Sequence, residues 1–230
     1  MFLRVLAQAG GRSQPGRTAN NVHKLGGVFS QSIRNMFINV ESTPNPSALK
    51  FLPGLEVLPS EYGSSMNFAS GMDAHSSPLA KKLFRIEGVN TVMFSQEWIS
   101  VNIDENAVSW AIVKPQVFAE VMDFFSQDGY QVVTNEPAPS DTQVYDDDTE
   151  VVAMIKELLE TRIRPSVQDD GGDILFKGFD EHSGIVDLEL AGSCTGCPSS
   201  SVTLKNGVEK MLMYYIPEVA GVNQINPEEL

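Results

Sequence analysis

One segment without apolar periodicity divides the sequence into two parts. It contains two prolines and four aspartates: Pro137, Pro139, Asp141, Asp146, Asp147 and Asp148. Prolines and acids without periodic apolar residues are typical of a linker, and each flanking part has the length of a small domain. We therefore predict five regions, which are a leader at 1–36, a first domain at 37–134, a linker at 135–148, a second domain at 149–222 and a tail at 223–230.

The first domain alternates strand and helix signals. Residues 37–41 and 48–52 read as strands joined by the turn Pro44–Ser47, and residues 89–94 and 98–103 read as a hairpin. Helices are expected to start at Ser77-Pro78 and at Pro115, and the Gly- and Ser-rich stretch 62–77 is expected to be a loop. Together these elements predict a small α+β domain.

The second domain has the predicted order α-β-β-CxxC-α. A helix with one apolar face begins near Thr149 and is expected to end at Pro165. Strands at 173–179 and 185–190 follow, and in the latter Val186, Leu188 and Leu190 should face the core, with Asp187 and Glu189 outward. A last helix precedes Pro217. The fold class is therefore α+β, with two small domains.

The N-terminal segment is basic and contains no acid before Glu41. Its basic residues are Arg4, Arg12, Arg17, Lys24 and Arg34. Spaced arginines, serines and short apolar stretches are typical of a mitochondrial transit peptide, and a disordered basic tail is the plainer alternative. We expect the protein in the mitochondrial matrix.

Composition argues against several classes of protein. The formal net charge of −14 disfavours binding to nucleic acid. No apolar run approaches the roughly 20 residues that cross a bilayer, so we expect no membrane insertion. The two cysteines are too few for a disulfide framework.

Those cysteines, Cys194 and Cys197, form a single CxxC pair ahead of a predicted helix. The positive end of a helix dipole favours thiolates, which bind metals and attack disulfides. A structural zinc ion or an iron-sulfur cluster normally takes four protein ligands, and one chain supplies two. His23, His75 and His182 lie in other predicted regions or in a turn, whereas two copies of the loop around a two-fold axis would supply four thiolates.

Three other interpretations of the pair remain open. The cysteines could carry no metal, or four thiolates could bind zinc in a dimer. A dithiol oxidoreductase similar to thioredoxin is the third, but that family places the pair early in a βαβ unit, and we expect no βαβ crossover here.

Other polar and aromatic residues receive structural interpretations. Asp169, Asp170 and Asp173 beside two glycines are expected to form a solvated turn rather than a metal site. Trp98 and Trp110 are expected in the core.

Two longer motifs resemble a known family. Pro165–Asp173 (PSVQDDGGD) and Gly192–Ser200 (GSCTGCPSS) closely resemble the NifU C-terminal, or Nfu-type, domain. Glu41–Phe51 (ESTPNPSALKF) resembles the N-terminal domain that accompanies it in mitochondrial Nfu proteins. The resemblance spans nearly all of the chain after the leader.

This resemblance implies a scaffold or carrier that is not an enzyme. It implies a [4Fe-4S] cluster held between the two subunits of a homodimer, with Cys194 and Cys197 as the cofactor-binding and metal-ligating residues and no catalytic residue. Its implied partners are upstream iron-sulfur assembly proteins and recipient apoproteins, including lipoyl synthase and respiratory-chain subunits. The choice of iron-sulfur over zinc rests on this resemblance alone.

Overall fold

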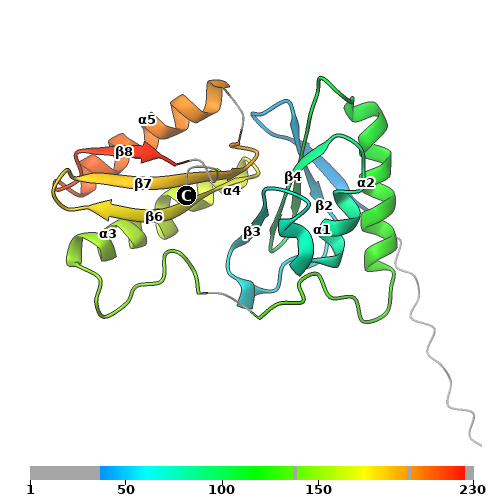
Figure 1. Ribbon diagram of the computed structural model, residues 1–230, viewed down its shortest axis with the longest axis horizontal. Coiled ribbons are helices and arrows are strands. Elements are labelled where there is room, and N and C mark those ends of the chain that lie inside the picture. The colour runs from blue at the N-terminus through cyan, green and yellow to red at the C-terminus, as the bar shows by residue number, and fades with distance from the viewer. Residues whose placement is uncertain (1–36, 137–138, 196–197, 226–230) are drawn as a thin grey trace, which may run out of the picture. The chain divides into compact units, whose positions relative to one another are not determined.

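The computed structural model describes residues 37–136, 139–195 and 198–225, without the side chains of 198–201 (Figure 1). The predicted leader lies outside these residues, as does most of the predicted tail. In the described part of the chain, no helix is long and apolar enough to cross a membrane.

An antiparallel sheet of five strands forms the centre of the first domain. In spatial order the strands are β1 (Asn39–Ser42), β2 (Ala48–Leu52), β5 (Ile99–Ile103), β4 (Val89–Ser95) and β3 (Ser65–Phe68). Both predicted strand pairs are confirmed, with Val40 opposite Phe51 and Phe94 opposite Ile99.

The prediction that residues 62–77 form only a loop is wrong. Strand β3 lies within this stretch, as does a short 3-10 helix, Asp73–Ser76, and a further 3-10 turn spans Ser60–Tyr62. Phe68 is fully buried, with its ring centroid 5.1 Å from that of Phe94. Packing against β4 therefore outweighs the low strand propensity of the surrounding glycines and serines.

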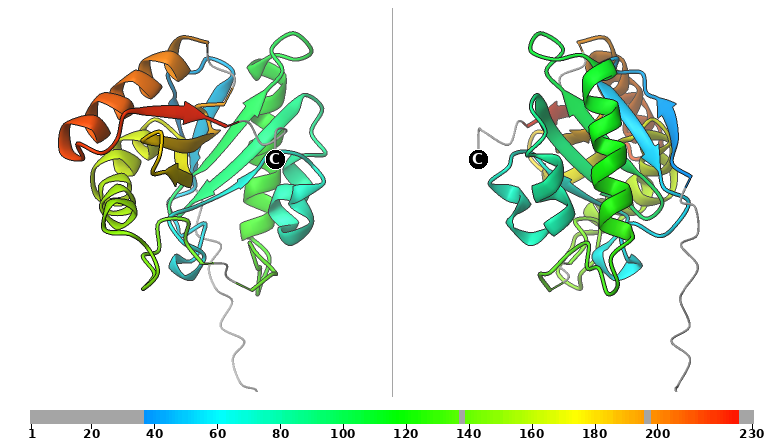
Figure 2. Two further views of the ribbon diagram at one scale, coloured as in Figure 1. Left: turned by 60° about the vertical axis from the view of Figure 1, so that its left-hand side comes forward. Right: turned by 90° about the vertical axis from the view of Figure 1, so that its right-hand side faces the viewer.

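Helices α1 (Pro78–Leu83) and α2 (Trp110–Phe125) lie on the same face of this sheet (Figure 2). The predicted start of α1 is confirmed, because the Ser77 side chain accepts a hydrogen bond from the Ala80 amide and Pro78 follows at the first position. The two helices enclose the apolar core of the domain against the sheet.

The predicted start of α2 at Pro115 is wrong, because the helix begins five residues earlier. The indole nitrogen of Trp110 donates a hydrogen bond to the Pro46 carbonyl oxygen (3.1 Å), and its ring packs near Phe51. Val113 is fully buried. These contacts hold the first turn in helical form although Pro115 cannot donate its backbone hydrogen bond.

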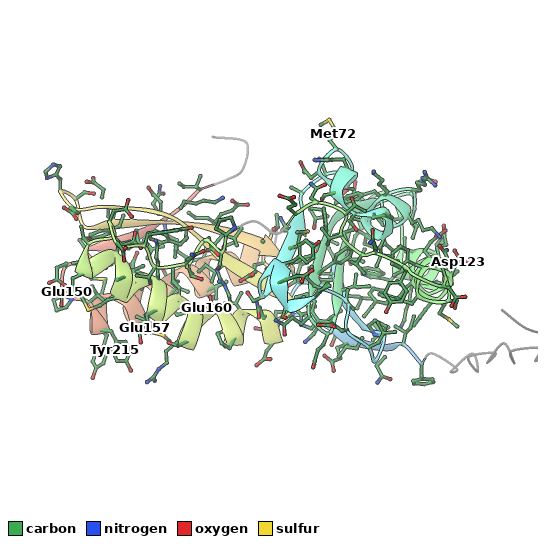
Figure 3. All side chains as sticks on the ribbon, turned by 90° about the horizontal axis from the view of Figure 1, so that it is seen from below. Met72, Asp123, Glu150, Glu157, Glu160 and Tyr215 are labelled. Carbon is green, nitrogen blue, oxygen red and sulfur yellow. The ribbon has the colours of Figure 1, made fainter. Side chains whose placement is uncertain are left out.

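The first helical segment of the second domain also continues past its predicted end. Helix α3 (Glu150–Leu158) leads through a π-helical turn (Leu159–Ile163) into α4 (Arg164–Asp169), and Pro165 lies at the start of α4. The wider π turn shifts the hydrogen-bond register, so the proline takes a first-turn position where no amide donor is needed. Glu150, Glu157 and Glu160 lie along this segment, and the Glu160 carboxylate binds the Arg164 guanidinium group (Figure 3).

The second sheet has three strands, one more than predicted. The antiparallel pair of β6 (Gly172–Asp180) and β7 (Ile185–Gly192) is confirmed, and Val186, Leu188 and Leu190 are buried as predicted. The third strand, β8 (Gly221–Gln224), pairs with β7 in parallel. Only Val222 in this short strand is a strong strand former, so its pattern is too weak to detect from the sequence.

Strand β8 contradicts the expectation that no βαβ crossover follows the cysteines. Helix α5 (Pro198–Tyr215) connects β7 to the parallel strand β8. The fold therefore does not exclude a thioredoxin-like exchange.

The two sheets belong to two separate apolar cores. The two domains nevertheless belong to one unit, in which Met93 and Trp98 of the first domain pack with Ala191 of the second. Trp98 is buried, as predicted, and Trp110 is partly buried. The chain thus contains two α+β domains, and the boundaries drawn from the sequence remain a prediction.

Candidate cysteine site

Cys194 lies on the turn that leaves strand β7. Gly192 adopts a positive φ of 63°, and its carbonyl oxygen accepts a hydrogen bond from the Thr195 amide (3.1 Å). The Ser193 amide donates to the Gly171 carbonyl oxygen (3.1 Å). Helix α5 begins at Pro198, the predicted first position after the CxxC pair, whereas Cys197 itself lies outside the described residues.

The Cys194 side chain is buried, with an exposed fraction of 6%, at the edge of the second core. Gly172 provides the space for its sulfur, because a Cβ atom at Gly172 would lie 2.2 Å from Cys194 Sγ. The glycine at the start of β6 is therefore a steric requirement of the cysteine turn.

A small cavity of about 70 Å³ lies beside Cys194. It is lined by residues of both domains: Pro44, Asn45, Ser166, Val167, Asp170, Ser193, Cys194 and Leu204. This volume accommodates only a few water molecules.

Three side chains of the first domain donate hydrogen bonds to the backbone near the cysteine. Asn45 Nδ2 donates to the carbonyl oxygens of Ser193 (2.9 Å) and Thr195 (3.2 Å). Asn102 Nδ2 donates to the carbonyl oxygen of Gly192 (2.8 Å). Lys50 Nζ donates to that of Asp169 (3.2 Å). Sequence reasoning missed these residues, and only the Pro-Asn-Pro turn around Asn45 gave a local signal.

The expected solvated turn of aspartates is only partly present. Asp169 and Asp170 are exposed, and the Asp170 carbonyl oxygen accepts a hydrogen bond from Ser193 Oγ (2.7 Å). Asp173 is instead fully buried, so its predicted solvation is wrong. Its Oδ1 atom lies 3.1 Å from Arg164 Nε. Because β6 begins at Gly172, the strand carries Asp173 beneath Arg164.

Arg164 is the centre of a buried ionic network. Its guanidinium group contacts Asp173, Glu160 and, through Nη2 at 2.8 and 2.7 Å, both carboxylate oxygens of Asp141. Burial lowers the pKa of Arg164, but the three carboxylates outweigh it and raise the pKa above the ordinary value. For Asp173 burial has the opposite effect and raises the pKa, although the nearby charge of Arg164 acts to lower it.

The network and a second ion pair hold the predicted linker against the second domain. Asp141 also accepts a hydrogen bond from the Phe176 amide (2.7 Å), and Lys156 Nζ lies 2.6 Å from Asp148 Oδ2. Bonding to Lys156, and then to the Tyr145 amide, lowers the pKa of Asp148. Asp141 and Asp148, which the composition assigns to a linker, thus form specific ion pairs and hydrogen bonds with the second domain.

Glu189 is another acid whose predicted environment is wrong. It points to the face of β7 away from the helices, as expected, but it is buried rather than solvated. Its carboxylate lies 2.6 Å from Lys177 Nζ on the neighbouring strand. A cross-strand ion pair therefore replaces the expected solvent contact.

The two histidines in the described part of the chain lie away from the cysteine turn. His75 lies in the exposed 3-10 helix of the first domain, and His182 lies in the turn between β6 and β7. His23 falls outside the described residues. Within the described ranges, no three side chains from His, Cys, Asp and Glu are grouped as metal ligands would be.

Two segments of the sequence, one in each domain, match protein-family models. Residues 155–223 match the "NifU-like domain", and residues 38–128 match "Scaffold protein Nfu/NifU N terminal". These matches define the class as a two-domain protein of the Nfu type, as the resemblance of the motifs predicted.

Relatives with both domains narrow this class. The chain is 54% identical over 192 residues to a protein of Drosophila ananassae and 50% identical over 205 residues to one of Homo sapiens, each described as "NFU1 iron-sulfur cluster scaffold homolog, mitochondrial". These alignments include 84% and 89% of this chain, which spans 65% of the fly protein and 78% of the human protein. The chain belongs to the family of mitochondrial NFU1 iron-sulfur cluster scaffold homologs, and it is a mitochondrial protein.

Proposed function

We propose that this protein is a carrier that holds a [4Fe-4S] cluster between two identical subunits and passes it on in the mitochondrial matrix. Cys194 and Cys197 of each subunit would be the four ligands. The observation that carries this proposal is the turn between β7 and α5, which holds Cys194 ahead of a helix N-terminus in a chain of the NFU1 family.

The number of ligands supports a site shared between subunits. Within the described residues a single chain groups no set of three candidate metal ligands, and the sequence contains two cysteines. Two copies would supply four thiolates. Because the cluster is cargo rather than a resident reagent, we propose no catalytic turnover for the protein.

Transfer follows from the same arrangement. A cluster ligated by two chains is released when those chains separate. The thiolates of a recipient can then replace those of the carrier as ligands. In line with the resemblance, we propose upstream iron-sulfur assembly proteins as the source of the cluster. Lipoyl synthase and respiratory-chain subunits are the proposed recipients.

Anaerobic reconstitution with iron and sulfide tests the proposal. The wild type should turn brown, contain about four iron and four sulfide ions per dimer, and double its mass by light scattering. Cys194→Ser should lose both the cluster and the added mass, whereas the exposed neighbour substitution Thr195→Ala should retain them. A cluster on a monomer without added thiol would contradict the shared site. A colourless protein that reduces insulin disulfides would instead favour the dithiol oxidoreductase.

A further inference from the structure

The first domain reaches the cysteine turn mainly through polar contacts. Its side chains Asn45 and Asn102 donate three hydrogen bonds to three carbonyl oxygens of the segment 192–195, at 2.8 to 3.2 Å. Among the described residues, a small apolar cluster of Met93, Trp98 and Ala191 lies between the domains, with Leu52 and Leu175 partly buried against it. Water can replace hydrogen bonds of this kind at modest cost, so such a contact can open reversibly.

Asn45 is placed for this contact by its own turn. Its Oδ1 atom accepts a hydrogen bond from the Ser47 amide (3.0 Å), which directs the Nδ2 group toward the cysteine turn. Prolines flank Asn45, and the Pro46 carbonyl oxygen is bonded to the Trp110 indole. Asn45 is itself buried, with an exposed fraction of 4%. It is therefore a rigid donor attached to the first domain.

This contact conflicts with the geometry that a shared cluster requires. Ligands from two subunits must meet at the surface of each, yet Cys194 is 6% exposed and Asn45 and Pro44 line the small cavity beside it. The cavity beside Cys194, of about 70 Å³, is too small for the cysteine turn of a second chain to enter.

We propose that the first domain closes the cysteine site of the cluster-free chain. Asn45 holds the turn in a position that buries Cys194, and the domains must separate at this contact before two chains can share a cluster. This inference rests on the proposed function. It gives the first domain a role, namely to limit access to the thiols until the cluster arrives.

The substitution Asn45→Asp tests the closure with little change of shape. It keeps the oxygen that accepts from the Ser47 amide, removes the donor, and brings a carboxylate close to two carbonyl oxygens. The matched control is Asn106→Asp, which makes the same charge change at an exposed residue of the same domain. The full chain carries Cys197→Ser in the parent and in every variant, so that only Cys194 reacts with an aromatic disulfide reagent.

We expect Asn45→Asp to increase the rate of Cys194 modification about tenfold or more, given the typical contribution of two hydrogen bonds. Asn106→Asp should leave the rate unchanged. Asn102→Ala, which removes the third bond from a different element, should increase it about fivefold. If Asn45→Asp fails to fold by circular dichroism, Asn102→Ala decides the question. Folded variants that react at the parent rate would overturn the closure.

Cluster loading separates this inference from the proposed function. With both cysteines present, Asn45→Asp should acquire iron and sulfide faster than the wild type under anaerobic reconstitution. Equal loading rates together with equal thiol reactivity would refute the closure and leave the scaffold function intact. If no protein loads a cluster, the proposed function fails, and the thiol rates still decide whether the first domain covers Cys194.

Discussion

Gly172 illustrates how closely the second domain is built around one sulfur atom. A side chain here would overlap Cys194 Sγ, whereas a Cβ atom at Gly178 of the same strand would meet nothing within 4 Å. We expect Gly172→Ala to lower the free energy of unfolding by about 1–3 kcal/mol, the usual cost of overpacking, as measured by urea denaturation. Gly178→Ala is the control and should lie within about 0.5 kcal/mol of the wild type. Equal losses at both positions would contradict this steric explanation.

Asp148 should make stability depend on pH. Its pKa is lowered from the ordinary value of 3.8, chiefly by the hydrogen bond from Lys156, so the folded state favours the ionised form. This stabilisation is present above the ordinary pKa and is lost as the pH falls through the lowered pKa of the folded state. Wild type and Asp148→Asn should therefore differ in urea midpoint at pH 7, and the difference should be smaller at pH 3.

The neighbouring aspartate provides the control for that pH series. Asp147 is exposed, and Asp147→Asn should follow the wild type at both pH values. A difference between wild type and Asp148→Asn that grows on acidification would contradict the assigned role of the ion pair with Lys156.

The sequence identifies some site residues and hides others. Cys194 and Cys197 can be recognised because they form a CxxC motif of two reactive side chains close together in the sequence. The role of Asn45 is not visible, because the prolines beside it indicate a turn but not its partner Ser193, which lies 148 residues away. The burial of Asp173 is not visible in the sequence either, because it depends on how the fold places Arg164 over the start of β6.

Helices and strands were predictable where their apolar periodicity is strong. The hairpins β4–β5 and β6–β7 are examples. Strands β3 and β8 have four residues each, and they exist because a neighbouring strand offers hydrogen bonds and an apolar contact. Helix ends near Pro115 and Pro165 were misplaced because tertiary contacts and a π turn accommodate these prolines.

Pro115 should reduce the stability of α2. It is exposed in the second turn of the helix, where it provides no backbone donor and its ring approaches the Ala111 carbonyl group. We expect Pro115→Ala to raise the free energy of unfolding by about 1–3 kcal/mol, measured by chemical denaturation. Gln116→Ala, also exposed, is the control and should change it by less than about 0.5 kcal/mol. A loss of stability in Pro115→Ala would show that the proline supports the helix start.

At the scale of the whole molecule, charge should govern the association of two subunits. Each chain has a formal net charge of −14, so two like chains repel at low ionic strength. The screening length falls from about 30 Å at 0.01 M salt to about 8 Å at 0.15 M. We therefore expect the cluster-bound dimer to dissociate several-fold less readily at the higher salt concentration, as measured by sedimentation equilibrium under anaerobic conditions.

The control for this salt series is the cluster-free Cys194→Ser chain, whose mass should not change over the same range. Dissociation that increases with salt would contradict the repulsion argument and would indicate that complementary ion pairs dominate the contact between subunits.

The parallel pairing of β8 with β7 has a consequence for the order in which the protein is completed. The strand preceding the cysteine turn obtains its second neighbour only from residues 221–224, whereas the first domain needs nothing beyond residue 133 for its sheet and core. During synthesis, which proceeds from the N-terminus, the asparagine donors can be in place before the cysteines arrive. The cysteine turn would thus fold against a first domain that is already folded.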